Sequence, residues 1–135
     1  MRKNIVVVGA GRVGRRVVEQ LDSGRQSITV VEPDPETCKQ LSTKHNRVIE
    51  GDGTDAETLE TANLSDADVV AALTDNTETN LAICETAKKQ APDARTILRI
   101  AHDGEQDYGY RTFVDHTVYP AAAGADVAVE QITRE

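Results

Sequence analysis

The chain has 135 residues, 39% of them hydrophobic, and a formal net charge of −8 at pH 7. This length suits one domain with one core, and the acidic balance argues against a nucleic-acid binder, which would usually present a basic face. No apolar stretch reaches the roughly 20 residues that a membrane-spanning helix needs, and the two cysteines, Cys38 and Cys84, lack metal-type spacing and suggest a reducing cytosol.

Apolar runs typical of strands alternate with helical patterns along the whole chain. The predicted strands are residues 4–10, 27–32, 47–52, 67–73, 95–101 and 116–120. The predicted helices are residues 12–24, 34–44, 54–62, 75–90 and 121–135, and residues 105–113 form either a short helix or an ordered loop. This alternation implies right-handed βαβ units. It predicts an α/β, Rossmann-like, doubly wound parallel sheet of six strands with helices on both faces, in a single domain over residues 1–135.

Polar residues mark the expected ends of several helices. Asp34, followed by Pro35 at the first helical position, predicts an N-cap. Thr54, with a glutamate three residues later, matches a capping box, and Asp75 begins a similar pattern. Gly24 is expected to end the first helix.

The most specific motif is G-x-G-x-x-G, formed by Gly9, Gly11 and Gly14 between the first strand and the first helix. Gly9 can make the tight turn, Gly11 lets a pyrophosphate approach the backbone, and Gly14 lets the helix pack on the strand. The free N–H groups at the helix start favour an anion. A purely structural turn is the alternative, but the strand before the motif and the helix after it favour a nucleotide site.

Charged residues near this motif indicate which groups of a nucleotide it would meet. Glu32 ends the second strand about 20 residues after the glycines, where an acidic residue accepts hydrogen bonds from ribose hydroxyls. A carboxylate there would repel a 2′-phosphate, so NADP is disfavoured; a simple surface glutamate is the alternative. Arg12 would oppose the helix dipole unless a phosphate is bound, so we expect it to contact phosphate, whereas Arg15 and Arg16 are expected on a solvated face.

Further polar residues follow the third, fourth and fifth strands, whose carboxyl ends meet at the ligand-binding edge of such sheets. Asp52 could reach the adenine amino group, whereas Thr54 is expected to cap its helix. The residues after the fourth strand either line the second half of a ligand or cap the next helix. Arg99 lies inside an otherwise apolar strand, where its charge needs a buried carboxylate or a ligand phosphate as a partner.

Together these motifs resemble the N-terminal domain of the RCK family, regulators of potassium conductance that include the TrkA subunits of Trk uptake systems. The resemblance covers nearly the whole chain and depends on an arginine in the glycine turn and on the stretches EPDPE, GDGTD and TDNTETN. It implies a Rossmann-like domain that binds NAD(H), ATP, ADP or AMP without turning them over. Nucleotide occupancy would shift the arrangement of domains in a dimer or ring under a membrane pore.

The resemblance also implies a set of nucleotide-binding residues, with NAD(H) as the foremost ligand candidate. The glycine turn would hold phosphates, Glu32 the ribose and the residues after the third strand the adenine, while those after the fourth strand would close the site. The implied residues are Gly9, Gly11, Arg12, Val13, Gly14, Glu32, Pro33, Asp52, Gly53, Thr54, Thr74, Asp75, Asn80 and Arg99.

The chain departs from the family pattern at three places. Glu32 stands where the family usually has aspartate, and Gly53 stands where it usually has alanine, which should loosen that turn. The sequence ends at ITRE, before the second ligand-binding lobe that usually follows in the family. We therefore expect either an excised domain or a stand-alone subunit.

Two classes of function remain open: a regulatory nucleotide-binding module, and an NAD-dependent oxidoreductase or its cofactor-binding domain. An enzyme needs a substrate site beside the nicotinamide and an acid or base. Tyr108 and Tyr110 have no lysine three or four residues on, and the histidines, His45, His102 and His116, are expected to be structural. We therefore expect a regulatory subunit with no catalytic and no metal-binding residues.

The expected partners are a nucleotide, a membrane-embedded potassium transporter subunit and further copies of the chain in a homodimer or larger assembly. The expected location is cytoplasmic, at the inner face of the membrane through the transporter. The last helix, residues 121–135, carries small and apolar residues where a partner could dock, or else it packs on its own sheet.

The composition favours a protein that works in high salt. Lysine is less frequent than arginine, and aspartate and threonine are plentiful. Equal melting temperatures at low and high KCl would contradict that last hypothesis.

Overall fold

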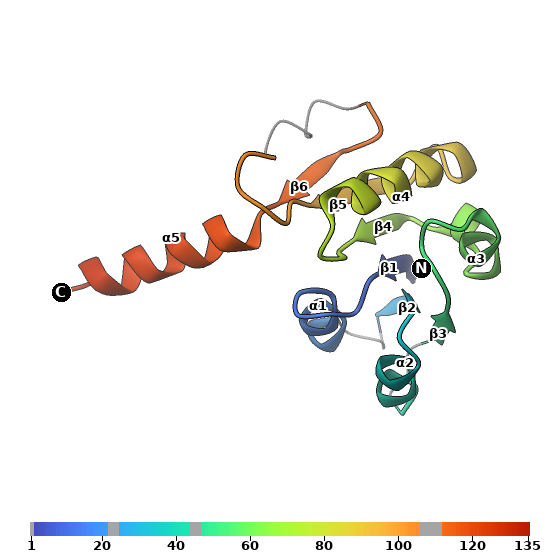
Figure 1. The fold of residues 1–135 in the computed structure, drawn as a ribbon, viewed down its shortest axis with the longest axis horizontal. Helices are drawn as coiled ribbons and strands as arrows, with labels where there is room; N and C mark the ends of the chain where they lie inside the picture. The colour runs from blue at the N-terminus through green and yellow to red at the C-terminus, as the bar shows by residue number, and fades with distance from the viewer. Residues whose placement is uncertain (1, 22–24, 44–46, 106–111) are drawn as a thin grey trace.

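A computed structural model describes residues 2–21, 25–43, 47–105 and 112–135 of the chain. Figure 1 shows a twisted sheet with helices on both of its faces and one long helix that projects away from it. The elements in chain order are β1 Lys3–Val8, α1 Gly14–Gln20, β2 Gln26–Glu32, α2 Pro35–Leu41, β3 Arg47–Glu50, α3 Ala56–Thr61, the short 3-10 helix η1 Leu64–Asp66, β4 Val69–Ala72, α4 Thr77–Gln90, β5 Arg95–Arg99, β6 His116–Val118 and α5 Pro120–Thr133.

The six strands form one sheet in the order β3-β2-β1-β4-β5-β6, and every neighbouring pair is parallel. This confirms the predicted doubly wound, Rossmann-like sheet. The chain builds outward from β1 through β2 to β3 and then returns to add β4 on the other side of β1. The carboxyl ends of β1 and β4 therefore diverge into opposite connections, and ligands bind at such a switch point.

Two apolar layers cover the sheet, as expected for parallel strands buried on both faces. One layer packs α3, η1 and α4 against β1, β4 and β5, with Leu59, Ile83 and Leu98 fully buried. The other packs α1 and α2 against β1 and β2, with Val7 and Val30 fully buried. The core consists mostly of valine, isoleucine, leucine and alanine, in keeping with the scarcity of aromatic residues.

Side-chain caps fix the starts of α2, α3 and α4, and one of the three predicted caps is confirmed. The Asp34 carboxylate accepts a hydrogen bond from the Thr37 backbone N–H at 3.0 Å, with proline at the first helical position. The predicted caps of the other two helices are wrong by one residue. Asp55 caps α3 and Asn76 caps α4, because these residues adopt the extended backbone of an N-cap and accept hydrogen bonds from the first turn.

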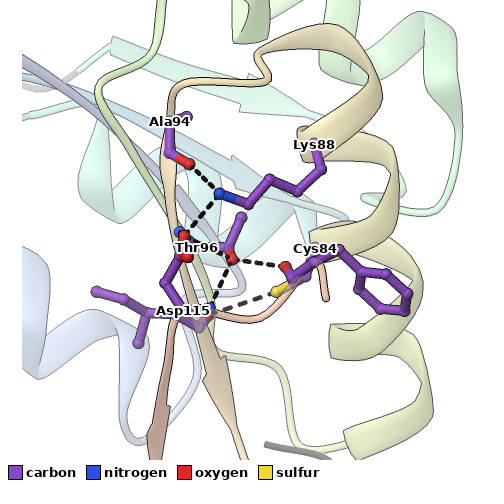
Figure 2. Close-up of polar contacts among 7 residues, drawn as sticks. Cys84, Lys88, Ala94, Thr96 and Asp115 are labelled. Carbon is purple, nitrogen blue, oxygen red and sulfur yellow. Dashed lines mark hydrogen bonds and ion pairs between the residues drawn. The ribbon is translucent and has the colours of Figure 1, made fainter. Parts of the chain in front are cut away.

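At the amino ends of β5 and β6, a cluster of polar groups ties α4 to the sheet. We call it the amino-edge clasp; its members are Lys88, Ala94, Thr96, Phe113 and Asp115. Figure 2 shows Lys88 reaching from α4 to the Ala94 carbonyl at 2.6 Å and to Asp115 Oδ2 at 2.7 Å. Asp115 Oδ2 also accepts from the Thr96 N–H at 2.8 Å, and Thr96 Oγ1 donates to the Phe113 carbonyl at 2.6 Å.

The final helix, α5, lies apart from the rest of the molecule (Figure 1). None of its residues is buried, and Val127, Val129 and Ile132 are 58%, 57% and 79% exposed. The alternative that this helix packs on its own sheet is therefore not what the structure shows. The prediction that the first helix ends at Gly24 is wrong, because α1 ends at Gln20 and the C-cap residue Leu21 has an extended backbone. His45, Tyr108 and Tyr110 lie outside the described residues, as does most of the ambiguous segment 105–113.

Candidate functional site

A cavity of about 340 Å³ lies at the carboxyl edge of the sheet, at the switch point between β1 and β4. Its volume falls within the usual range of small-molecule sites. The loops after β1, β2, β4 and the end of β5 contribute its walls. The lining residues are Gly9, Ala10, Gly11, Arg12, Glu32, Pro33, Leu73, Thr74, Asp75 and Arg99.

The three glycines of the motif have different structural reasons to be glycine. Gly9 has a φ of +97°, and a Cβ there would lie 2.8 Å from the Thr74 backbone nitrogen. A Cβ on Gly14 would lie 1.8 Å from the Gly9 carbonyl oxygen. A Cβ on Gly11 would meet no atom within 4 Å apart from its own chain neighbours. Packing within the described chain thus explains Gly9 and Gly14, whereas the space in front of Gly11 is open to a ligand.

Glu32 lies beside the glycine turn at the end of β2 and is 9% exposed. Its Oε1 accepts a hydrogen bond from the Ala10 N–H at 2.8 Å, and its Oε2 accepts one from the Asp34 N–H at 2.9 Å. The carboxylate therefore braces the glycine turn, a role that the sequence did not predict. Each oxygen keeps a second lone pair, so the same side chain can still accept a ribose hydroxyl.

Arg99, at the end of β5, is also 9% exposed, and it faces the cavity from the β4 side. Its Nη1 donates to the carbonyls of Thr74 at 3.2 Å and Leu73 at 3.4 Å, and its buried Nε has no partner in the described part of the chain. Burial lowers the pKa of Arg99, with the Asp75 carboxylate opposing this shift and Arg12 adding to it. No described carboxylate hydrogen-bonds this guanidinium, so its charge is available to an anion in the cavity.

Asn80, predicted to close the site, is fully buried in α4 and supports the wall from behind. Its Oδ1 accepts from the Thr74 N–H at 3.0 Å and from the Thr74 hydroxyl at 2.6 Å. Its Nδ2 donates to the carbonyls of Thr74 at 3.0 Å and Arg99 at 2.9 Å. Asn80 therefore fixes two lining residues without lining the cavity. Asp75 does line the cavity, and it is exposed and does not cap α4.

The turn after β3 lies outside the cavity lining. Asp52 Oδ1 accepts from the Thr54 N–H at 2.9 Å and hydroxyl at 2.8 Å, and these bonds lower the pKa of Asp52. Gly53 is buried, and a Cβ there would lie 2.3 Å from Val8 Cγ1. The expectation that Gly53 loosens this turn is wrong, because the turn packs closely against the core.

The structure thus brings together eight of the predicted site residues: Gly9, Gly11, Arg12, Glu32, Pro33, Thr74, Asp75 and Arg99. Val13, Gly14, Asp52, Gly53, Thr54 and Asn80 do not line the cavity. Sequence reasoning missed Ala10 and Leu73, although Ala10 stands inside the glycine motif and Leu73 ends a predicted strand. Two arginines directly follow Gly14. Arg16 is exposed, while Arg15 is partly buried and donates to the Gln40 side chain.

A second cavity, of about 390 Å³, lies at the opposite edge of the sheet, near the amino ends of β1, β2 and β3. Arg47 in its wall donates to the Thr61 carbonyl at 2.7 Å. It contains none of the glycine-turn residues, so we take the smaller cavity as the candidate site. Among the described residues, no group of three or more histidine, cysteine, aspartate or glutamate side chains could hold a metal ion, and no helix has the length and apolar character needed to cross a bilayer.

Comparison with known proteins assigns the family. The family model described as the TrkA-N domain matches residues 5–120. The chain belongs to the TrkA-N family. A Trk system potassium uptake protein TrkA homolog from Pyrococcus horikoshii is 35% identical over 96% of this chain. A protein of the same description from Methanothermobacter thermautotrophicus is 32% identical over 96% of this chain. The chain spans 58% and 60% of the lengths of these two TrkA-N relatives.

Solved structures support the same fold for this TrkA-N chain. The TrkA-N domain of the Escherichia coli inner membrane protein ybaL superposes with a TM-score of 0.87, at 23% identity and with 97% of each chain covered. The Shewanella denitrificans Kef CTD in its AMP-bound form gives 0.75, at 19% identity, covering 97% of this chain and 80% of that one. The GsuK channel bound to NAD gives 0.72, at 20% identity, covering 87% of this chain and 21% of that one. At these identities the likeness concerns the fold alone.

Proposed function

We propose that residues 1–135 form one nucleotide-sensing regulatory domain of a potassium uptake system. The observation that carries this proposal is Arg99, a largely buried cation that lines the cavity and that no carboxylate of the described residues pairs with. A largely buried cation without an anionic partner is costly, and a phosphate bound in the cavity would stabilise the guanidinium charge. The TrkA descriptions of the relatives and the NAD-bound and AMP-bound structures of the same fold support this proposal.

The proposed ligand is an adenine nucleotide, with NAD(H) as the first candidate and ATP, ADP or AMP as alternatives. The phosphates lie over Gly11 between Arg12 and Arg99, and a ribose hydroxyl donates to Glu32. A 2′-phosphate at that ribose would be repelled by the Glu32 carboxylate, which is largely shielded from solvent, so NADP(H) binds poorly. The turn at Asp52 and Thr54 lies near the adenine.

We further propose that the domain binds the nucleotide without chemical turnover. The described residues that line the cavity include no histidine, cysteine, tyrosine or lysine, so among them a general acid or base would have to be Glu32 or Asp75. Glu32 is occupied by two backbone N–H groups, and Asp75 is an exposed residue. This arrangement favours a sensor over the alternative of an NAD-dependent oxidoreductase.

The regulatory signal in this proposal passes through a second copy of the chain. α5 exposes Val127, Val129 and Ile132 and buries none of its residues in the described part of the chain, and Val118 on β6 is 37% exposed beside the start of that helix. A homodimer that covers both surfaces removes this apolar area from water. Nucleotide binding then biases the arrangement of the dimer, and a membrane-embedded potassium transporter subunit at the cytoplasmic face responds to it.

Calorimetric titration with NADH, NAD, ATP, ADP, AMP and NADPH tests the proposal. Arg12→Ala should weaken the preferred nucleotide by about tenfold, the effect of losing one charge-assisted contact. Arg95→Ala is the matched control: it removes the same charge from an exposed side chain at the amino end of β5, at the opposite edge of the sheet. Equal binding by both variants, binding of NADPH as tight as that of NADH, or steady oxidation of NADH would each contradict the proposed sensor.

A further inference from the structure

The charged groups of the candidate cavity are arranged in two pairs. Arg12 and Glu32 lie on the β1–β2 side, and Arg99 and Asp75 lie on the β4–β5 side. The formal charges of these four side chains cancel, so the net charge of the described lining does not by itself favour one nucleotide over another. The positions of the two carboxylates can therefore contribute to a preference among nucleotides.

The two carboxylates differ in how far they are already neutralised. The oxygens of Glu32 each accept a backbone N–H, at 2.8 and 2.9 Å, and its side chain is buried. Asp75 is exposed on the loop between β4 and α4, and within the described part of the chain its carboxylate accepts no hydrogen bond. Asp75 therefore acts on the site mainly through its charge.

That charge acts on the same arginine that would attract a phosphate. Asp75 and Arg99 line the same cavity, and the Asp75 carboxylate raises the pKa of Arg99 against the larger lowering effect of burial. Arg99 lines the cavity, and its buried Nε has no hydrogen-bond partner in the described part of the chain. A phosphate group that reaches Arg99 must also approach Asp75, and the repulsion offsets part of the attraction.

We propose that Asp75 is the specificity-determining residue that makes this site select a dinucleotide over a nucleoside triphosphate. This inference depends on the proposed nucleotide function. A ligand whose ribose meets Glu32 and whose diphosphate lies over Gly11 directs its remaining part toward the β4 side. For NAD that part is a second ribose with a cationic ring, which a carboxylate attracts. For ATP it is a terminal phosphate, which the same carboxylate repels.

The test is a calorimetric titration of three proteins, wild type, Asp75→Asn and Asp93→Asn, with NAD, AMP, ADP and ATP. Asp93 is the matched control because it is an exposed aspartate just before β5, at the opposite edge of the sheet. We expect Asp75→Asn to tighten ATP by about tenfold, ADP by less and AMP least, with NAD unchanged or weaker. The gain for ATP should shrink as KCl is raised, because salt screens an exposed charge.

Each remaining outcome decides against a particular claim. If Asp75→Asn tightens all four nucleotides by one factor, or behaves like Asp93→Asn, then Asp75 does not discriminate between them and this inference is overturned, while the proposed function stands. If wild type and both variants bind none of the nucleotides, the proposed function and this inference fall together. Melting curves of the three proteins serve as the check on folding, which neither exposed side chain is expected to change.

Discussion

The two edges of the sheet contain similar polar residues but leave them in different states. At the amino edge, the clasp pairs Lys88 with both the Ala94 carbonyl and Asp115, and the bonds lie between 2.6 and 2.7 Å. At the carboxyl edge, the buried Nε of Arg99 has no partner among the described residues, and the space in front of Gly11 is open. In the proposed function, the polar groups of the amino edge stabilise the fold through partners that are present, whereas Arg99 at the carboxyl edge is left for a ligand.

The largest expected effect is a difference in stability between substitutions at Gly14 and at Gly11, both at the carboxyl edge. Gly14→Ala should cost more than about 3 kcal/mol or prevent folding, because its Cβ would overlap the Gly9 carbonyl. Gly11→Ala should leave the free energy of unfolding nearly unchanged but weaken nucleotide binding, because its methyl group enters the open space. Urea unfolding and calorimetry of the two variants measure both quantities. Similar stability losses in the two variants would show that the turn is only architectural.

The next effect belongs to the amino-edge clasp. Asp115→Ala removes the acceptor of the Lys88 ammonium and the Thr96 N–H, and it should cost about 2 kcal/mol of stability. Nucleotide affinity should stay within a factor of two of the wild-type value, which corresponds to about 0.4 kcal/mol of binding free energy. Urea unfolding gives the first value and calorimetry the second, with Asp93→Ala as the control for loss of an exposed aspartate. A large drop in affinity would show that the amino-edge clasp influences the candidate site, and the two edges would then not have separate roles.

Arg99→Met should show the opposite balance. The variant removes the guanidinium that faces the cavity, so nucleotide affinity should fall by about 10- to 100-fold, or about 1.4–2.7 kcal/mol. Stability should change little or rise, because the charge is buried without a complete set of partners. Lys88→Met is the matched substitution at the amino edge, and it should lower stability and leave affinity unchanged. If both variants lose stability and neither loses affinity, Arg99 is a structural residue.

The smallest effect is the response of the clasp to pH. Hydrogen bonds from Lys88 and Thr96 lower the pKa of Asp115 below its ordinary value of 3.8. A depressed folded-state pKa contributes stability that is fully present above the unfolded-state value and is lost as pH falls through the folded-state value. Wild type should therefore lose more stability than Asp115→Asn when the pH is lowered from 5 to about 2. Parallel acid unfolding curves for the two proteins would contradict this assignment.

Local sequence patterns were enough to predict the sheet, because βαβ alternation and a glycine motif after the first strand leave few topologies. They also identified Arg99 as a charge in need of a partner. Local patterns did not predict the features that depend on contacts between residues distant in sequence. The packing of Gly53 against Val8 and the burial of Asn80 behind Thr74 are tertiary contacts. The caps of α3 and α4 were displaced because adjacent polar residues compete for one N-cap, and only the backbone geometry selects between them.

The detached position of α5 has a thermodynamic consequence for the domain. α5 has 14 residues, and helices of about 12–15 residues are marginal in water when no other element packs on them. In a lone chain, α5 therefore belongs to a helix–coil equilibrium separate from the cooperative unfolding of the sheet. Its amide hydrogens should exchange with solvent far faster than those of β1 and β4. Docking on a partner would slow that exchange, so hydrogen-exchange protection of the α5 amides reports whether the chain has assembled with a partner.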